Sequence, residues 1–83
     1  MKVEFSKLEK GDLYFTQIGK NTVIAMKTRD IDNQYGYTTH NMVYISGWSG
    51  YPSHEFKYEL VEKCGEEVDK MPWEALRSFR KPL

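Results

Sequence analysis

The sequence contains one cysteine, Cys64, in 83 residues, so no disulfide can form within the chain. Cys64 and two histidines make a poor ligand set for zinc, and we expect no metal site and no other cofactor. The chain also lacks an apolar run of signal-peptide length or of the roughly 18 residues that suggest a membrane span. These absences favour a reduced, cytoplasmic protein in which Cys64 is a small semi-buried residue that closes a strand.

Neither sign of charge is in excess, because 12 Lys and Arg balance 12 Asp and Glu. Dedicated nucleic-acid binders usually carry a basic excess, since neutralisation of phosphates supplies most of their non-specific affinity. The balance lowers the expectation of a nucleic-acid partner, although it is compatible with a basic patch on one face.

Charge is missing altogether from residues 33–54, in a chain in which 29% of the residues are charged. A gap of this length has two explanations. Either both faces of the segment are buried, or its exposed part forms a surface that avoids the cost of desolvating charge.

No catalytic motif is complete. The sequence from Gly47 to Gly50 places Ser49 between glycines, but Tyr51 occupies the position of the second glycine of a nucleophile elbow. His40 and His54 are 14 residues apart, with no pair of carboxylates between them. We expect each histidine to make a structural hydrogen bond.

Two ligand-binding loops are likewise absent. Residues 30–41 imitate a calcium loop, yet Gly36 comes one position late and Asn41 stands where a bidentate glutamate is needed. The sequence contains neither GxxxxGK(S/T) nor GxGxxG, the glycine-rich motifs that bind phosphate. The sequence therefore indicates a protein that is not an enzyme.

Alternating apolar and polar residues predict a mainly β (α+β) fold in a single domain, 1–83. After Val68 the spacing of Trp73, Leu76 and Phe79 changes to that of a helix with one apolar stripe. This helix either plugs the open end of the β-structure or docks on a partner. The predicted elements are strands at 12–18 and 22–28 joined by a turn at 19–21, strands at 37–46 and 55–63, and a C-terminal helix at 69–81.

The segment FSKLEKGDLYF (5–15) resembles the opening of SH3-like barrels, in which a Gly-Asp turn leads into the first long strand. The segment YELVE (58–62) resembles their closing strand. The resemblance implies a small, partly open antiparallel barrel of four or five strands. Such barrels bind peptides, proteins or nucleic acids, so the fold alone does not select the partner.

The uncharged segment is rich in aromatic residues, interleaved with Asn, Ser, Thr and Gly. Tyr and Trp offer large contact areas with few rotatable bonds, and small polar residues adapt their hydrogen bonds, as in antibody paratopes. The tyrosines within strands also suit a position lining the core. We expect a partner-binding surface whose candidate residues are Trp48, Tyr51, Tyr35, Tyr37, Tyr44 and His54.

These patterns favour a non-enzymatic module that binds a protein. A domain of this size also resembles the accessory proteins of tailed phages that bind and inhibit one host factor in the host cytoplasm. RNA or single-stranded DNA is the second hypothesis, with bases stacked on the aromatic rings and phosphates contacted by Lys20, Lys27 and Arg29. The third is an oligomer that holds a small nucleotide-like ligand between aromatic loops.

Overall fold

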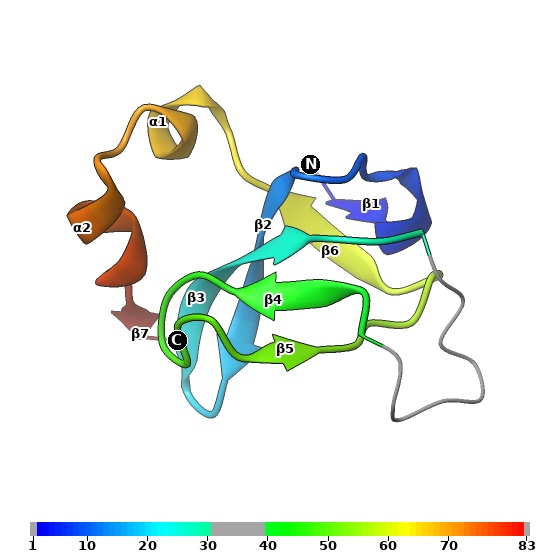
Figure 1. The fold of residues 1–83 in the computed structure, drawn as a ribbon, viewed down its shortest axis with the longest axis horizontal. Coiled ribbons are helices and arrows are strands. Elements are labelled where there is room, and N and C mark those ends of the chain that lie inside the picture. The colour runs from blue at the N-terminus through cyan, green and yellow to red at the C-terminus, as the bar shows by residue number, and fades with distance from the viewer. Residues whose placement is uncertain (1, 31–39, 83) are drawn as a thin grey trace.

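The computed structural model describes residues 2–30 and 40–82 (Figure 1). Its strands form one antiparallel sheet in the order β1-β6-β2-β3-β4-β5, and β7 pairs with the first residues of β3. The strands are β1 (Lys2–Glu4), β2 (Leu13–Ile18), β3 (Asn21–Lys27), β4 (Met42–Tyr44), β5 (Pro52–Ser53), β6 (Leu60–Lys63) and β7 (Lys81–Pro82). The helices are the 3-10 turn η1 (Phe5–Lys7), α1 (Glu66–Asp69) and α2 (Trp73–Arg77).

The predicted mainly β fold is confirmed, but the sheet is open. It has seven strands, and within the described residues its outer strands β1 and β5 do not pair with each other. The prediction of a partly open barrel of four or five strands differs from this sheet, which has seven strands and is not closed into a barrel. β1 and β5 have only three and two residues, which leaves few backbone groups with which to close a barrel.

The β2–β3 hairpin lies at the centre of the sheet and is confirmed. Its register runs from Leu13 opposite Met26 to Ile18 opposite Asn21. Gly19 in the turn has a φ of 60°, a conformation that glycine adopts without strain. Alternation along the two strands places successive side chains on opposite faces, so each face needs its own cover.

Each face of the sheet carries a core. Core 1 is covered by the residues around η1, and core 2 by the C-terminal segment, where α1 and α2 lie to one side of the sheet (Figure 1). The buried residues of core 1 are Phe5, Leu8, Tyr14, Ala25, Met42 and Val61, and those of core 2 are Ile24, Ile45, Cys64 and Val68.

The single helix predicted at 69–81 is replaced by two short helices and a strand. Pro72 is the N-cap of α2, and its missing N–H and its ring prevent α1 from continuing through it. Leu76 and Phe79 pack against core 2 as the apolar stripe predicted. Trp73 does not, since it is 55% exposed.

Two predicted strands are shorter than expected. The strand predicted at 37–46 is reduced to β4, and residues 37–39 lie outside the described part of the chain. The strand predicted at 55–63 is reduced to β6, because residues 56–59 form a turn in which the Glu59 N–H donates to the Phe56 carbonyl at 3.0 Å.

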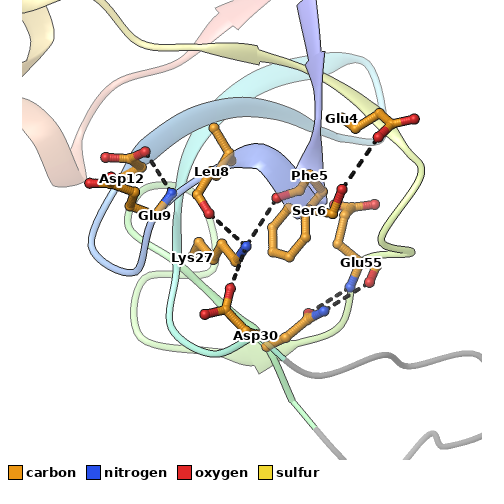
Figure 2. Close-up of polar contacts among 10 residues, drawn as sticks. Glu4, Phe5, Ser6, Leu8, Glu9, Asp12, Lys27, Asp30 and Glu55 are labelled. Atoms are coloured by element: carbon orange, nitrogen blue, oxygen red, sulfur yellow. Dashed lines mark hydrogen bonds and ion pairs between the residues drawn. The ribbon is translucent and has the colours of Figure 1, made fainter.

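Lys27 is buried, so the prediction that it contacts phosphate is wrong. Its ammonium donates to the carbonyls of Leu8 at 2.7 Å and Phe5 at 3.2 Å, and pairs with Asp30 at 2.8 Å (Figure 2). The same nitrogen lies 5.0 Å from the centre of the Phe5 ring, within range of a cation–π contact. Lys27 thus ties η1 and the chain after it to β3 above core 1.

Replacing Lys27 with Met should lower the free energy of unfolding by about 3 kcal/mol. The Leu8 carbonyl loses the ammonium as its donor, the Phe5 carbonyl keeps only the Leu8 N–H, and Asp30 loses its ion pair. The exposed Lys20→Met variant is the control and should change stability by less than about 0.5 kcal/mol. Urea denaturation measures both. Equal stability of the two variants would show that the buried ammonium is dispensable.

Candidate functional site

Three aromatic side chains form a continuous cluster at the β4–β5 connection. Tyr44 belongs to β4, and Trp48 and Tyr51 lie in the loop that follows it. The ring centre of Trp48 is 5.7 Å from that of Tyr44 and 5.7 Å from that of Tyr51, at interplanar angles of 84° and 63°. Trp48 is 57% exposed and Tyr51 58% exposed. We call these three residues the aromatic cluster.

Tyr44 connects the aromatic cluster to the interior. It is half-buried and packs against core 1, whereas Trp48 and Tyr51 extend outward from it. Burial, the negative charge of Glu55 and the proximity of Tyr51 raise the pKa of Tyr44. The aromatic cluster is thus an exposed continuation of core 1.

The loop that carries the aromatic cluster is closed by backbone hydrogen bonds. The Gly50 N–H donates to the Tyr44 carbonyl at 2.7 Å, and the Tyr44 N–H donates to the Tyr51 carbonyl at 3.0 Å. The Tyr51 N–H donates to the Trp48 carbonyl at 2.9 Å. Gly47 and Gly50 have φ values of 70° and 84°, which a residue with a Cβ adopts only with strain.

The loop is also attached to β3 by hydrogen bonds at Ile24. The Ile24 N–H donates to the hydroxyl of the fully buried Ser46 at 2.8 Å. The Ile24 carbonyl accepts from the N–H groups of Ile45 at 2.8 Å and Ser46 at 3.1 Å. A Cβ on Gly47 would lie 2.9 Å from Ile18 Cδ1, so the loop backbone is in close contact with the β2–β3 hairpin. The rings therefore project from a fixed backbone.

A pair of side chain–backbone hydrogen bonds holds the far end of the β4–β5 hairpin. The buried Asn41 amide donates to the Glu55 carbonyl at 2.9 Å, and its side-chain oxygen accepts the Glu55 N–H at 2.8 Å. The Glu55 carboxylate accepts from the Tyr14 hydroxyl at 3.2 Å. Burial raises the pKa of Glu55 even though the hydrogen bond from Tyr14 opposes that shift.

The structure brings together only part of the predicted binding set. Tyr44, Trp48 and Tyr51 form the aromatic cluster, whereas Tyr35 and Tyr37 lie outside the described residues. His54 is half-buried, and its ring packs edge-on to that of Phe56, with 6.3 Å between the two ring centres.

The predicted phosphate contacts do not form one patch. Lys20 and Arg29 are exposed but flank opposite ends of β3, a strand that spans about 20 Å. Lys27, between them, is buried.

Asn41 and Ser46 are the residues that the sequence reasoning missed. Both are fully buried, and both shape the hairpin that presents the aromatic cluster. The sequence signal that could have indicated their burial is a small polar residue next to apolar ones, within a segment that carries no charge. Such a residue, when buried, must find a hydrogen-bond partner.

Two of the concavities among the described residues bear on the candidate site. A shallow, uncharged depression is lined by Trp48, Ser49, Gly50, Tyr51 and Pro52. A groove of about 710 Å³ lies beside the C-terminal segment, and its lining includes Phe15, Phe79, Glu62 and Lys81.

The described residues do not assemble groups for metal or thiol chemistry. Within residues 2–30 and 40–82, no three His, Cys, Asp or Glu side chains are placed to hold a metal ion. Cys64 is buried, and its burial raises the pKa of the thiol to about 12, so it is not a thiolate at neutral pH.

The chain matches no protein-family model, no curated protein and no solved structure. No helix in the described part of the chain is long and apolar enough to cross a membrane. The function is therefore inferred from the geometry of the residues alone.

Gly47 and Gly50 provide a direct test of how tightly the loop is packed. Both have positive φ, but an added Cβ would lie 2.9 Å from Ile18 at Gly47 and would have open space at Gly50. Gly50→Ala should lower the free energy of unfolding by about 1 kcal/mol, from backbone strain alone.

Gly47→Ala should cost about 1–2 kcal/mol more than Gly50→Ala, because side-chain crowding adds to the strain. Adding Ile18→Val to Gly47→Ala should recover part of that difference. Equal losses for the two alanine variants in thermal or urea unfolding would mean that the loop does not rest on the β2–β3 hairpin.

Proposed function

We propose that this protein is a non-enzymatic module that binds a protein partner through the aromatic cluster. The observation that supports it is the pair of large, exposed rings of Trp48 and Tyr51, which contact each other on a loop that is hydrogen-bonded to the sheet. Rings of this kind dominate the binding energy of protein interfaces. A fixed loop lowers the entropy that binding must overcome.

The charge distribution supports a protein partner of neutral character. The loop and its flanks belong to the segment 33–54, which contains no Asp, Glu, Lys or Arg. The centre of a protein interface is depleted in charged residues and enriched in Tyr and Trp. The contact residues and the depression between them have this composition.

The two alternatives have less support. Stacking of RNA or single-stranded DNA on these rings needs cations nearby for the phosphates, yet Lys27 is buried and Arg29 lies beyond the far end of β3 from Lys20. A nucleotide-like ligand needs an enclosed pocket, and the depression is shallow. An inhibitor of one host protein, as among tailed-phage accessory proteins, is the most concrete form of the proposal.

The test compares two single variants in the aromatic cluster with a matched control. Trp48→Ala and Tyr51→Ala should each weaken partner binding by about 2 kcal/mol or more, a loss of roughly 30-fold. Trp73→Ala removes an indole that is 55% exposed at a different place on the surface and should leave affinity unchanged. The partner is first captured from an extract of the cells that encode the chain, and affinity is then measured by calorimetry with the purified components.

Melting temperatures of the same variants decide between a binding surface and a structural element. Exposed side chains contribute little to stability, so all three variants should melt within a few degrees of the wild type. A large drop for Trp48→Ala would make the ring a structural element. Equal losses of affinity for Trp48→Ala and Trp73→Ala would remove the aromatic cluster as the site. A complex that weakens steeply with salt would point instead to nucleic acid.

A further inference from the structure

The aromatic cluster lies next to an open edge of the sheet. β5 is the last strand in the sheet order and, within the described residues, pairs only with β4. An edge strand presents unpaired N–H and C=O groups, on which another strand can add. Peptides and second copies of a chain often bind in this way.

The hydrogen bonds of β5 show which of its residues face that edge. The carbonyl of Tyr51 accepts from the Tyr44 N–H at 3.0 Å, and the carbonyl of Ser53 accepts from the Asn41 N–H at 3.1 Å. Backbone groups of an antiparallel strand point alternately to its two sides. Since residues 51 and 53 face β4, Pro52 between them faces outward.

Pro52 therefore stands at the centre of the open edge. It has no N–H, so an incoming strand would find an acceptor there but no donor, and its ring would crowd the added strand. The position is an exposed one in a two-residue strand, directly after Tyr51 of the aromatic cluster.

The opposite edge of the sheet is protected by other means. β1 has three residues, of which Lys2 and Glu4 are charged. Short length and charged side chains are the usual means by which native edges resist pairing. β5 is also short, but it carries no charge, and a proline stands where β1 has charged side chains.

We infer that Pro52 closes the β5 edge to strand addition, so that the aromatic cluster takes the side chains of a folded protein surface and not a strand added to the sheet by a peptide or by a second copy of this chain. The identity of the partner as a protein rests on the proposed function, whereas the block at Pro52 does not. Without that block, exposed rings beside an open edge would favour pairing between copies.

The experiment compares Pro52→Thr with Ser53→Thr in the full chain. Both changes add a β-branched residue to β5, but only the first adds an N–H that points to the open edge. Sedimentation velocity gives the mass across micromolar to millimolar protein. We expect Pro52→Thr to form dimers or larger species, and Ser53→Thr to keep the mass of the wild type. Pro52→Ala introduces the same N–H and replaces Pro52→Thr should circular dichroism show that Pro52→Thr does not fold.

Each outcome has one meaning. Association of the Pro52 variants alone supports the block, provided that the amide at residue 52 exchanges hydrogen more slowly in the associated variant than in the same variant diluted to monomer. Wild-type mass for both Pro52 variants overturns it, and so does equal association of Ser53→Thr, which would assign the effect to β-propensity. Since the experiment uses the protein alone, it can fail while the Trp48 and Tyr51 variants still lose their partner, and the reverse.

Discussion

Three hydrogen bonds at Ile24 connect the central strand to the loop that carries the exposed rings. Ile24 donates to the Ser46 hydroxyl and accepts from two successive N–H groups of the loop. The side chain of Ile24 is fully buried in core 2, so these three hydrogen bonds belong to a residue of the protein interior. The rings of Trp48 and Tyr51 are therefore presented by a loop whose backbone is attached to the interior, and the binding proposal depends on that attachment.

An open sheet has two faces, and a short chain has few residues with which to cover them. Both faces must be covered, and the chain uses its first turn for one face and its last residues for the other. Lys27 stabilises the first of these segments, because its ammonium donates hydrogen bonds to the carbonyls of Phe5 and Leu8 above core 1. The two remaining edges are short, and Pro52 and the charges of β1 limit pairing there. The apolar surface that stays exposed at the β4–β5 loop is the one that the binding proposal assigns to a partner.

Features set by local spacing could be predicted from the sequence, and those set by distant partners could not. The β2–β3 hairpin follows from alternation around a turn containing Gly19, and the exposure of Trp48 and Tyr51 follows from their glycine-rich surroundings. The burial of Lys27 depends on carbonyls about 20 residues earlier, and the position of Glu55 depends on hydrogen bonds from the side chain of Asn41, 14 residues earlier. Neither leaves a periodic signal. Pro72 is compatible with the first turn of the single helix predicted at 69–81, but in the structure it separates two helices.

The central claim is that the aromatic cluster stands on a rigid loop in the free protein. Backbone ¹⁵N relaxation measures this directly for the amides of Ser46, Gly47, Gly50 and Tyr51. The account predicts order parameters close to the ~0.85 of rigid backbone, equal to those of β3. Values below about 0.6 for these amides would show a loop that is mobile before binding, and would contradict the account.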